Sequence, residues 1–373
     1  MPVSVVNRRM RTLAGCIALA LFALPLLAAC APRFIPMGPP VTTPKIEMAA
    51  EAEHPGLGEL PFLGEMTVAD GTQLPLRSWL PKAPPTAVIV ALHGFNDYSN
   101  AFDMPGPYWA ERGVATYAYD QRGFGRAPDA GRWAGVDTYI DDLRSAAELL
   151  RARHPGVPLY ALGESMGGAI AMMAMTDPRP PDVDGAIFVA PAVWDRSHMP
   201  FYQTWTLWIA SNTVPWMALS AKGLDILPSD NIEMLRKLSA DPLVIKSTRV
   251  DTIRGLVDLM DDAFAAAPKL NAPSLLLYGA RDEVVPEKPT LAMMASLPRN
   301  GRHQVAIYSR GYHMLLRDLQ GPAVWDDILA WIGAPKSALP SGADLEARQK
   351  LAPRHSHRAG RLQAALLDRT TRS

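Results

Sequence analysis

One pentapeptide, Gly163-Glu164-Ser165-Met166-Gly167, restricts the possible folds of this chain more than any other feature. It follows an apolar run at residues 159–162 that is typical of a strand, and small and apolar residues with helical character come after it. G-x-S-x-G between a strand and a helix is the pattern of a nucleophile elbow. A serine at so sharp a turn has a strained backbone, and the strand and helix on either side of it come close together. The flanking positions must therefore lack bulk, which is why they are glycines. We therefore predict that Ser165 lies above a strand end, at the positive end of a helix dipole.

Apolar runs alternate with helical stretches on both sides of this turn. The runs typical of buried strands lie at residues 86–92, 114–119, 159–162, 185–190, 273–278 and 303–308. Alternating apolar residues around Asp70-Gly71 indicate an antiparallel hairpin ahead of them. Strands that alternate with helices predict an α/β fold, because each crossover helix covers a face of the sheet. We expect a mostly parallel, eight-stranded sheet flanked by helices, built from residues 61–190 and 265–334.

Between residues 191 and 264 this alternation stops. The segment is rich in aromatic side chains, namely Trp194, Phe201, Tyr202, Trp205, Trp208 and Trp216. Because it separates two strands and follows Ser165, we predict a helical cap over the carboxyl edge of the sheet, where ligands bind in such folds. Any single aromatic is expected to pack within the cap, whereas the cluster as a whole points to an apolar acyl pocket.

The N-terminus has the features of an export signal. Three arginines between residues 8 and 11 precede an apolar run at 13–29 that ends in Leu-Ala-Ala-Cys. This pattern predicts a lipoprotein signal peptide at residues 1–29, with lipid attached to Cys30 after cleavage. Acyl chains on Cys30 would anchor the protein to a membrane surface of the bacterial cell envelope, facing the periplasm or in the outer membrane. The alternative is an uncleaved transmembrane anchor, because the run is just long enough to span a bilayer.

Composition excludes several other functions. The 373 residues have a formal net charge of zero, so no overall field favours nucleic acid. A chain that begins at Cys30 has one thiol, which excludes an internal disulfide and a cysteine-based metal site. Residues 30–60 are rich in proline and are predicted to form a semi-rigid tether. Residues 335–373 show little apolar periodicity and are predicted to be a disordered, net basic tail.

A serine nucleophile needs a base, and the base needs an orienting group. Asp282 directly follows the run at 273–278, and His313 follows the last strand-like run. The order Ser165, Asp282, His313 is the chain order of α/β-hydrolase triads. The alternatives for the acid are Glu283, Asp258 and Asp318. Among the other histidines, His93 alone follows a predicted strand at the same edge.

The turn after the first buried strand supplies the second half of the predicted site. His93-Gly94-Phe95 stands where an oxyanion-hole donor is expected, so the backbone N–H groups of Phe95 and Met166 are predicted to form the oxyanion hole. His93 itself is expected to brace the loop. The glycine-rich turn at residues 120–125 is expected to serve loop geometry alone.

Together these residues resemble the monoacylglycerol lipase and lysophospholipase branch of the α/β-hydrolase superfamily, of the serine aminopeptidase S33 type. The resemblance covers residues 63–332 and rests on His93-Gly94-Phe95, Asp120-Gln121-Arg122-Gly123-Phe124-Gly125, Gly163-Glu164-Ser165-Met166-Gly167-Gly168, Asp282 with Val285-Pro286, and Gly311-Tyr312-His313. It implies an α/β-hydrolase fold with Ser165 as nucleophile, His313 as base and Asp282 as its partner. Phe95 and Met166 are the implied oxyanion donors. It also implies a cap that admits one acyl chain, and neither a cofactor nor a metal. The chain departs from many members at residues 126–128, Arg-Ala-Pro, after the glycine turn.

The leading hypothesis is a membrane-tethered serine hydrolase of single-chain lipid esters, such as monoacylglycerols or lysophospholipids, with no obligate protein partner. The same triad could serve a short-chain esterase, an acyltransferase or an aminopeptidase-like amide hydrolase, because the acceptor is chosen by the cap and by water exclusion. A hypothesis of another class is a non-catalytic lipid-binding lipoprotein, which would have no need of all three triad residues.

Overall fold

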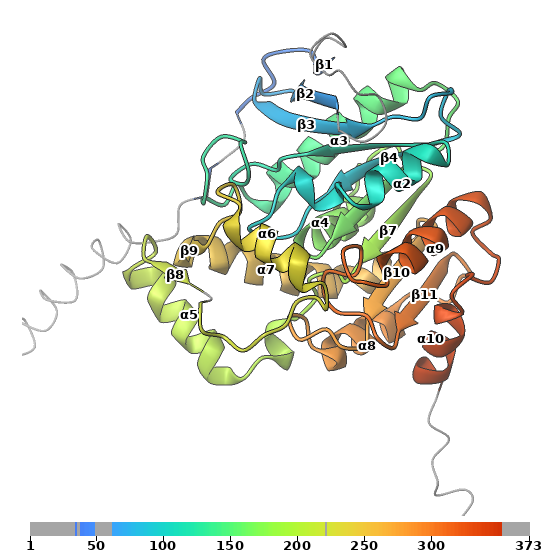
Figure 1. The fold of residues 1–373 in the computed structure, drawn as a ribbon. Helices are drawn as coiled ribbons and strands as arrows, with labels where there is room; N and C mark the ends of the chain where they lie inside the picture. Colours follow the sequence, from blue (N-terminus) through green and yellow to red (C-terminus); the bar gives the residue numbers. More distant parts are fainter. Residues whose placement is uncertain (1–33, 36–37, 49–61, 221, 353–373) are drawn as a thin grey trace, which may run out of the picture.

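A nine-stranded sheet forms the centre of the computed structural model, which describes residues 34–35, 38–48, 62–220 and 222–352 (Figure 1). The strand order is β1-β2-β3-β5-β4-β6-β7-β10-β11. The strands are β1 (Lys45–Met48), β2 (Phe62–Thr67), β3 (Gln73–Trp79), β4 (Ala87–Leu92), β5 (Val114–Tyr119), β6 (Leu159–Glu164), β7 (Gly185–Val189), β10 (Ser274–Gly279) and β11 (His303–Tyr308). From β5 to β11 all neighbours are parallel, and β1, β2 and β3 pair antiparallel. The predicted α/β class and the hairpin are confirmed.

Two layers of helices cover the two faces of the sheet (Figure 1). The helices of the core are α2 (Pro105–Glu111), α3 (Val136–Arg153), α4 (Met166–Thr176), α7 (Val250–Ala266), α8 (Glu287–Ser296), α9 (Gly321–Gly333) and α10 (Ala343–Leu351), with short 3-10 turns η2 (Ser99–Phe102) and η4 (Ala267–Lys269). Strand β4 shows why both layers are needed. Val88 and Val90 point into the core shared with α3, α4, α7 and α8, whereas Ile89 and Ala91 point into the core shared with α2 and α9. Because successive side chains alternate across a sheet, a strand that is apolar throughout must be covered on both faces.

The strand order reverses at β4, and this reversal positions the site. From β4 the chain crosses to β5 on one side, and it later returns to β6 on the other side. In such sheets a crevice opens at the carboxyl ends of the strands that flank the reversal. The carboxyl ends of β4 and β6 are Leu92 and Glu164, so the loops that begin with His93 and Ser165 meet there.

The sheet has one strand more than predicted, because β1 lies within the predicted tether. Residues 45–48 pair antiparallel with β2 in the register Lys45 to Thr67. Ile46 and Met48 pack against the core, while Lys45 and Glu47 face solvent. The prediction of a tether through residues 30–60 is therefore wrong at β1. Four residues with two apolar side chains give too short an alternation to stand out in a proline-rich segment.

The predicted tail begins too early. Helix α10 lies within residues 335–373 and packs against β11, with Leu339, Ala343 and Ala347 buried. The backbone N–H of Ser341 donates to Asp327 on α9, 2.9 Å away, and fixes the approach to α10. The prediction of disorder is therefore wrong over residues 335–352, because small alanines and a side-chain hydrogen bond replace the large apolar side chains that periodicity detects. Residues 353–373 lie outside the described residues.

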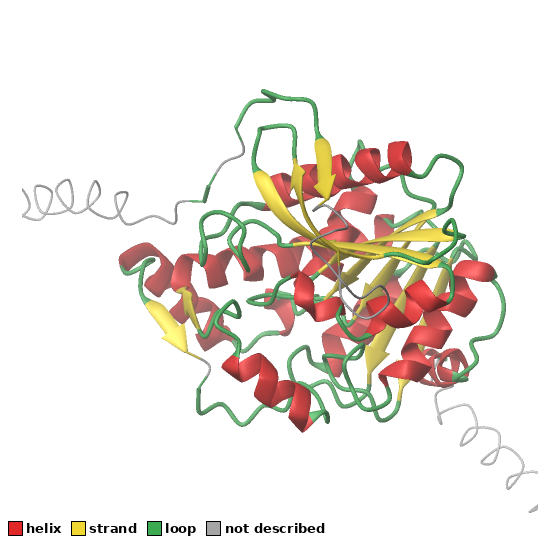
Figure 2. Cartoon of the chain, turned by 45° about the horizontal axis from the view of Figure 1, so that its top comes forward, coloured by secondary structure: helices red, strands yellow, loops and turns green. Residues whose placement is uncertain are grey.

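The segment predicted as a cap holds η3 (Arg196–His198), α5 (Phe201–Thr213), β8 (Ala218–Ser220), α6 (Ile232–Ala240) and β9 (Ser247–Arg249), followed by α7. It is mostly helical, but β8 and β9 form a separate antiparallel ladder, visible apart from the main sheet in Figure 2. Helix α7 runs past the predicted boundary at residue 264 to Ala266 and packs against α4. It therefore belongs to the core as much as to the cap.

The predicted signal peptide and Cys30 lie outside the described residues. Among the helices of the described part, none is both long enough and apolar enough to cross a membrane.

Candidate active site

Ser165 occupies a strained turn between β6 and α4. Its φ of 52° and ψ of −113° are costly for a residue with a Cβ. The turn is held by its backbone, since the Ser165 N–H donates to Val189 O at 2.9 Å and the Ser165 carbonyl accepts from the N–H groups of Ala169 and Ala192. A Cβ at Gly167 would lie 2.2 Å from the carbonyl oxygen of Leu92. Glycine is thus required there so that α4 can approach β4.

His313 and Asp282 complete a hydrogen-bonded chain that starts at Ser165. His313 Nε2 lies 2.9 Å from Ser165 Oγ, and His313 Nδ1 lies 2.8 Å from Asp282 Oδ2. The other oxygen of Asp282 accepts from the backbone N–H groups of Val284 and Val285, at 2.8 and 2.9 Å. Both carboxylate oxygens are thereby occupied and the ring of His313 is fixed. The structure brings together the three side chains singled out in the sequence, each from a loop that follows a parallel strand.

The surroundings of His313 act on its pKa in opposite directions. Burial alone lowers the pKa, because the imidazolium loses its hydration. The charge and hydrogen bond of Asp282 outweigh this effect, and the pKa of His313 is raised above its usual 6.5. An imidazole in this setting accepts a proton more readily than one in water, which suits a general base.

The alternative acids are occupied by other contacts. Glu283 accepts from the backbone N–H of Leu227, Asp258 accepts from Arg196 and Arg254, and Asp318 accepts from Ser229 and from the Tyr312 N–H. Of these, Asp318 fixes the loop that carries His313. Asp282 is the one among the four candidates that is hydrogen-bonded to His313.

The loop after β4 passes directly against Ser165. A Cβ at Gly94 would lie 3.4 Å from Ser165 Cβ, so the next residue, Phe95, borders the same space. Met166 is the first residue of α4, where a helix has unsatisfied N–H groups. Within the described residues neither the Phe95 N–H nor the Met166 N–H has a protein acceptor. Both are therefore available to an oxygen atom bound next to Ser165.

His93 is buried and joins two loops. Its Nδ1 lies 2.8 Å from the carbonyl oxygen of Gly94, and its Nε2 accepts from the backbone N–H of Gln121 at 3.0 Å. Burial lowers the pKa of His93, which favours the neutral ring with one donor and one acceptor. Asp120 accepts from the N–H groups of Ser99 and Arg126 in the neighbouring turn. Both residues support loop geometry, as expected from the sequence.

An ion cluster beside the triad was not predicted. Arg317 Nη2 lies 2.7 Å from Asp97 Oδ2 and 3.1 Å from Glu164 Oε2, and all three side chains are buried. Burial raises the pKa of Glu164, against the opposing charge of Arg317. The cluster ties together the ends of β4, β6 and the His313 loop, which carry Phe95, Ser165 and His313. The sequence contains a signal for this cluster, because each of its three ionisable residues lies within four positions of a predicted site residue.

A cleft of about 340 Å³ opens over Ser165 and His313. Its volume lies in the range of small-ligand sites. The lining is mostly apolar and comprises Phe95, Ala192, Trp194, Pro228, Leu256, Met260, Val284, Val285 and Met314, with Asp97, Glu164 and Arg317 as charged members. Leu256 and Met260 come from α7, so this helix forms one wall of the cleft.

The aromatic cluster of the cap does not form this cleft. Trp194 lines it, but Phe201, Tyr202, Trp205, Trp208 and Trp216 are exposed on and beside α5. The predicted acyl pocket made by that cluster is therefore wrong, as is the expectation that each aromatic packs within the cap. Helix α5 packs against the rest of the protein on one face only, because it has few neighbours. Thr204, Leu207 and Ser211 lie on that face, and the aromatic side chains lie on the exposed side of the helix.

Among the described residues, no group of three or more His, Cys, Asp or Glu side chains could hold a metal ion.

Comparison with known proteins places this geometry in a family. The family described as "Serine aminopeptidase, S33" matches residues 83–320. Human monoglyceride lipase is 25% identical over 276 residues, which cover 72% of this chain and 90% of that relative. Monoacylglycerol lipase of Mycolicibacterium smegmatis is 24% identical over 264 residues, covering 70% and 93%. The crystal structure of a soluble variant of monoglyceride lipase from Saccharomyces cerevisiae shares the fold, with a TM-score of 0.64 at 19% identity over 75% of this chain and 97% of that one.

Proposed function

This chain belongs to the serine aminopeptidase S33 family, and on that premise we propose that it cleaves carboxylic esters of single-chain lipids through Ser165. It is an α/β-hydrolase of the lipase and esterase class. The observation that carries the proposal is the hydrogen-bonded chain from Ser165 through His313 to Asp282 at the floor of an apolar cleft. A monoacylglycerol or a lysophospholipid offers one acyl chain to such a cleft and one ester to the serine.

In the proposed reaction His313 Nε2 takes the Ser165 proton while Oγ attacks the ester carbonyl carbon. The carbonyl oxygen becomes an oxyanion that accepts hydrogen bonds from the N–H groups of Phe95 and Met166. The C–O bond to the alcohol then breaks, His313 returns the proton to the leaving oxygen, and an acyl-enzyme remains. Water repeats the sequence, gives up a proton to His313 and releases the fatty acid.

The distribution of polarity in the cleft supports a substrate with one apolar chain and one polar end. Leu256 and Met260 present apolar surface along α7, where an acyl chain would lose water contact favourably. Arg317 borders the cleft and also a neighbouring cavity of about 420 Å³ that is lined by Asn100, Asp103, Asn231 and Lys237, among others. We propose that the polar end of the substrate faces this side.

We also propose that Cys30 carries lipid and holds the protein on a membrane of the bacterial cell envelope. The support is the sequence pattern of the first thirty residues. A cysteine-to-serine change at position 30 should release the protein from the membrane fraction without lowering turnover of a soluble ester. Retention of that variant in the membrane would instead support an uncleaved span.

The test of the reaction is a series of p-nitrophenyl esters from acetate to palmitate, measured with residues 31–373 beside the Ser165→Ala variant. The proposal predicts a maximum at medium or long chains that is absent from the variant. Activity confined to acetate and butyrate would indicate a short-chain esterase. No ester hydrolysis at any length would shift the assignment to amide or acyl-transfer chemistry, or to a binding protein.

A further inference from the structure

One nitrogen atom joins three loops of the candidate active site. Arg317 Nη2 lies 2.7 Å from Asp97 Oδ2 and 3.1 Å from Glu164 Oε2. Glu164 immediately precedes Ser165, and Asp97 belongs to the loop of Phe95. Each carboxylate therefore connects Arg317 to a different part of the site, either the nucleophile or the loop that is expected to supply an oxyanion donor.

Arg317 is also held close to His313 by its own backbone. The Arg317 N–H donates to Met314 O at 2.8 Å, so a tight turn that contains Arg317 follows His313 directly. The Arg317 carbonyl accepts from Asn231 Nδ2 at 3.0 Å, and the Met314 N–H donates to Pro228 O at 2.9 Å. These bonds attach the turn to the cap, so a displacement of Arg317 would also displace the imidazole ring.

The contacts of Arg317 close a ring around the hydrogen bond between nucleophile and base. His313 Nε2 lies 2.9 Å from Ser165 Oγ. From Ser165 the chain leads to Glu164, the ion pair leads to Arg317, and the tight turn leads back to His313. Because β6 and the turns on this path are held by hydrogen bonds, the position of Arg317 Nη2 determines how His313 lies relative to Ser165.

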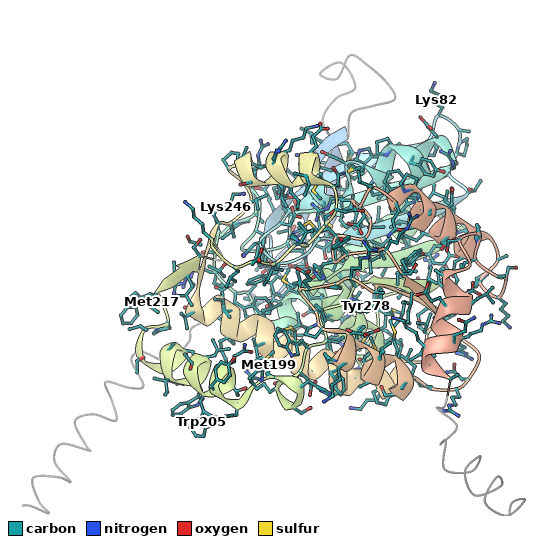
Figure 3. All side chains as sticks on the ribbon, turned by 60° about the horizontal axis from the view of Figure 1, so that its bottom comes forward. Lys82, Met199, Trp205, Met217, Lys246 and Tyr278 are labelled. Atoms are coloured by element: carbon teal, nitrogen blue, oxygen red, sulfur yellow. The ribbon has the colours of Figure 1, made fainter. Side chains whose placement is uncertain are left out.

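The loop of Asp282 is held in a different way. Tyr278, which lies within the body of the protein in Figure 3, donates from its hydroxyl group to Val285 O at 3.0 Å. This bond fastens the loop to β10, and the Val285 N–H donates to the carboxylate of Asp282. The Asp282 loop therefore has support of its own, whereas the His313 loop is tied to β6 through Arg317.

A second buried ion cluster of the same composition allows a comparison. Arg122 Nη1 lies 2.7 Å from Asp70 and Arg122 Nη2 lies 2.8 Å from Asp142, with all three side chains buried. Arg122 Nε also donates to Asp142, and Nη1 donates to Thr72, so each nitrogen of the guanidinium has a partner. This cluster joins the β2–β3 turn, the glycine-rich turn and α3, none of which carries a predicted site residue.

The cluster at Arg317 is less completely hydrogen-bonded. Among the described residues, neither Arg317 Nε nor Glu164 Oε1 has a hydrogen-bond partner, although both atoms are buried. Unpaired buried polar atoms cost free energy, and a buried ion cluster often stabilises a fold no better than apolar side chains of similar volume would. The location of this cluster is therefore explained better by the three loops that it joins than by stability alone.

We propose that Arg317 is a positioning residue that aligns His313 with Ser165 during catalysis and fixes the loop of Phe95 through Asp97. The proposal rests on the reaction proposed for Ser165, because it concerns the alignment of the same groups. A displacement of about 1 Å between reacting groups can lower a rate by about 10²-fold. A side chain that acts only through the position of His313 can therefore control kcat.

Hydrolysis of p-nitrophenyl acetate by the purified protein tests the proposal in Arg317→Lys and Arg317→Met. Lysine keeps the positive charge but ends one bond short of Nη2. Arg317→Lys should therefore leave the melting temperature close to that of wild type and lower kcat by about 10- to 100-fold. Arg317→Met should lower kcat at least as much and should also lower the melting temperature. KM should change little in both variants, because alignment acts on the chemical step.

The matched control is Arg122→Met, which removes the same side chain from a buried cluster of the same composition. It should lower the melting temperature about as much as Arg317→Met and leave kcat close to that of wild type. Kinetics are measured well below the lowest melting temperature, and if Arg317→Met does not fold, the comparison of Arg317→Lys with Arg122→Met decides. Equal losses of kcat at the two arginines, or full kcat in Arg317→Lys, overturn the proposal. A raised KM at unchanged kcat also overturns it, because Arg317 would then be a binding residue.

A measurement without turnover separates this proposal from the reaction itself. The nitrogen NMR resonance of His313 Nε2, assigned by its change in Ser165→Ala, reports the hydrogen bond to Ser165 Oγ. In Arg317→Lys it should move toward its position in Ser165→Ala, and in Arg122→Met it should stay in place. That result in a protein that hydrolyses no ester would refute the reaction and uphold the positioning role. An unmoved resonance in Arg317→Lys would overturn the positioning role.

Discussion

The end of the sheet around Ser165 and the outer face of α5 differ in whether their side chains have partners within the protein. Around Ser165, buried polar groups are fixed by partners: Asp282 accepts three hydrogen bonds, and Arg317 holds two buried carboxylates. On α5, large apolar groups stand in solvent with few partners. The buried polar groups of the first region are paired within the protein, whereas the apolar side chains of the second remain in contact with water. The comparison teaches that this fold pairs its buried polar groups at the candidate active site and leaves large apolar groups uncovered on α5.

The largest effect is expected from removing the nucleophile. Ser165→Ala should lower kcat on esters by about 10⁶-fold if the triad acts as a unit. The melting temperature should stay close to that of wild type, because alanine also fits the turn. Steady-state kinetics and calorimetry measure the two quantities, and retained turnover would disprove the role of Ser165.

A smaller loss is expected when the orienting group loses its charge. Asp282→Asn should lower kcat by about 10⁴-fold, since the amide holds the imidazole in the wrong tautomer. The pH dependence of kcat/KM tests the direction of the pKa shift of His313. In wild type, kcat/KM should rise with pH through a pKa above 6.5, because Asp282 raises the pKa of His313 and the base acts when neutral. In the variant the rising part of the curve of kcat/KM against pH should move to lower pH. If this part of the curve stays in place, a group other than His313 titrates.

The ion cluster should matter for stability. Arg317→Met leaves Asp97 and Glu164 buried without a cation and should cost about 3–5 kcal/mol in the free energy of unfolding. Because burial raises the pKa of Glu164 in the folded state, the loss should be smaller near pH 5, where protonation removes the charge, than near pH 8. Denaturant titration of wild type and variant at both pH values measures this difference in the free energy of unfolding.

The matched control is Arg281→Met, an exposed arginine beside Tyr312 in the same region. It should change stability by less than about 0.5 kcal/mol. An equal loss in both variants would mean that the cluster at Arg317 has no special role.

The smallest effect is expected on the exposed outer face of α5. In the absence of lipid, Trp205→Ser should alter the free energy of unfolding by no more than about 0.5 kcal/mol, because the ring is already 62% exposed. Chemical denaturation checks this. A large loss would show that the ring contributes to the folded core, and the contrast between the two regions would fail.

The same contrast explains what could be predicted from the sequence. The order of Ser165, Asp282 and His313 and their positions after strands were readable, because an elbow needs glycines and parallel strands end at one edge. Strand β1 and helix α10 were not, since their contacts depend on two apolar residues and on small alanines. Nor was the direction of the α5 aromatics, because an aromatic stripe at helical spacing has the same pattern whether it faces a core or solvent.

The central claim is that Ser165 carries the acyl group during turnover. The most direct measurement is acid quenching of the reaction with p-nitrophenyl laurate, followed by mass spectrometry of the intact protein and its peptides. The account predicts one lauroyl group per chain on the peptide that contains Ser165, absent from Ser165→Ala. A lauroyl group on another residue, or full turnover without any acylated peptide, would contradict it.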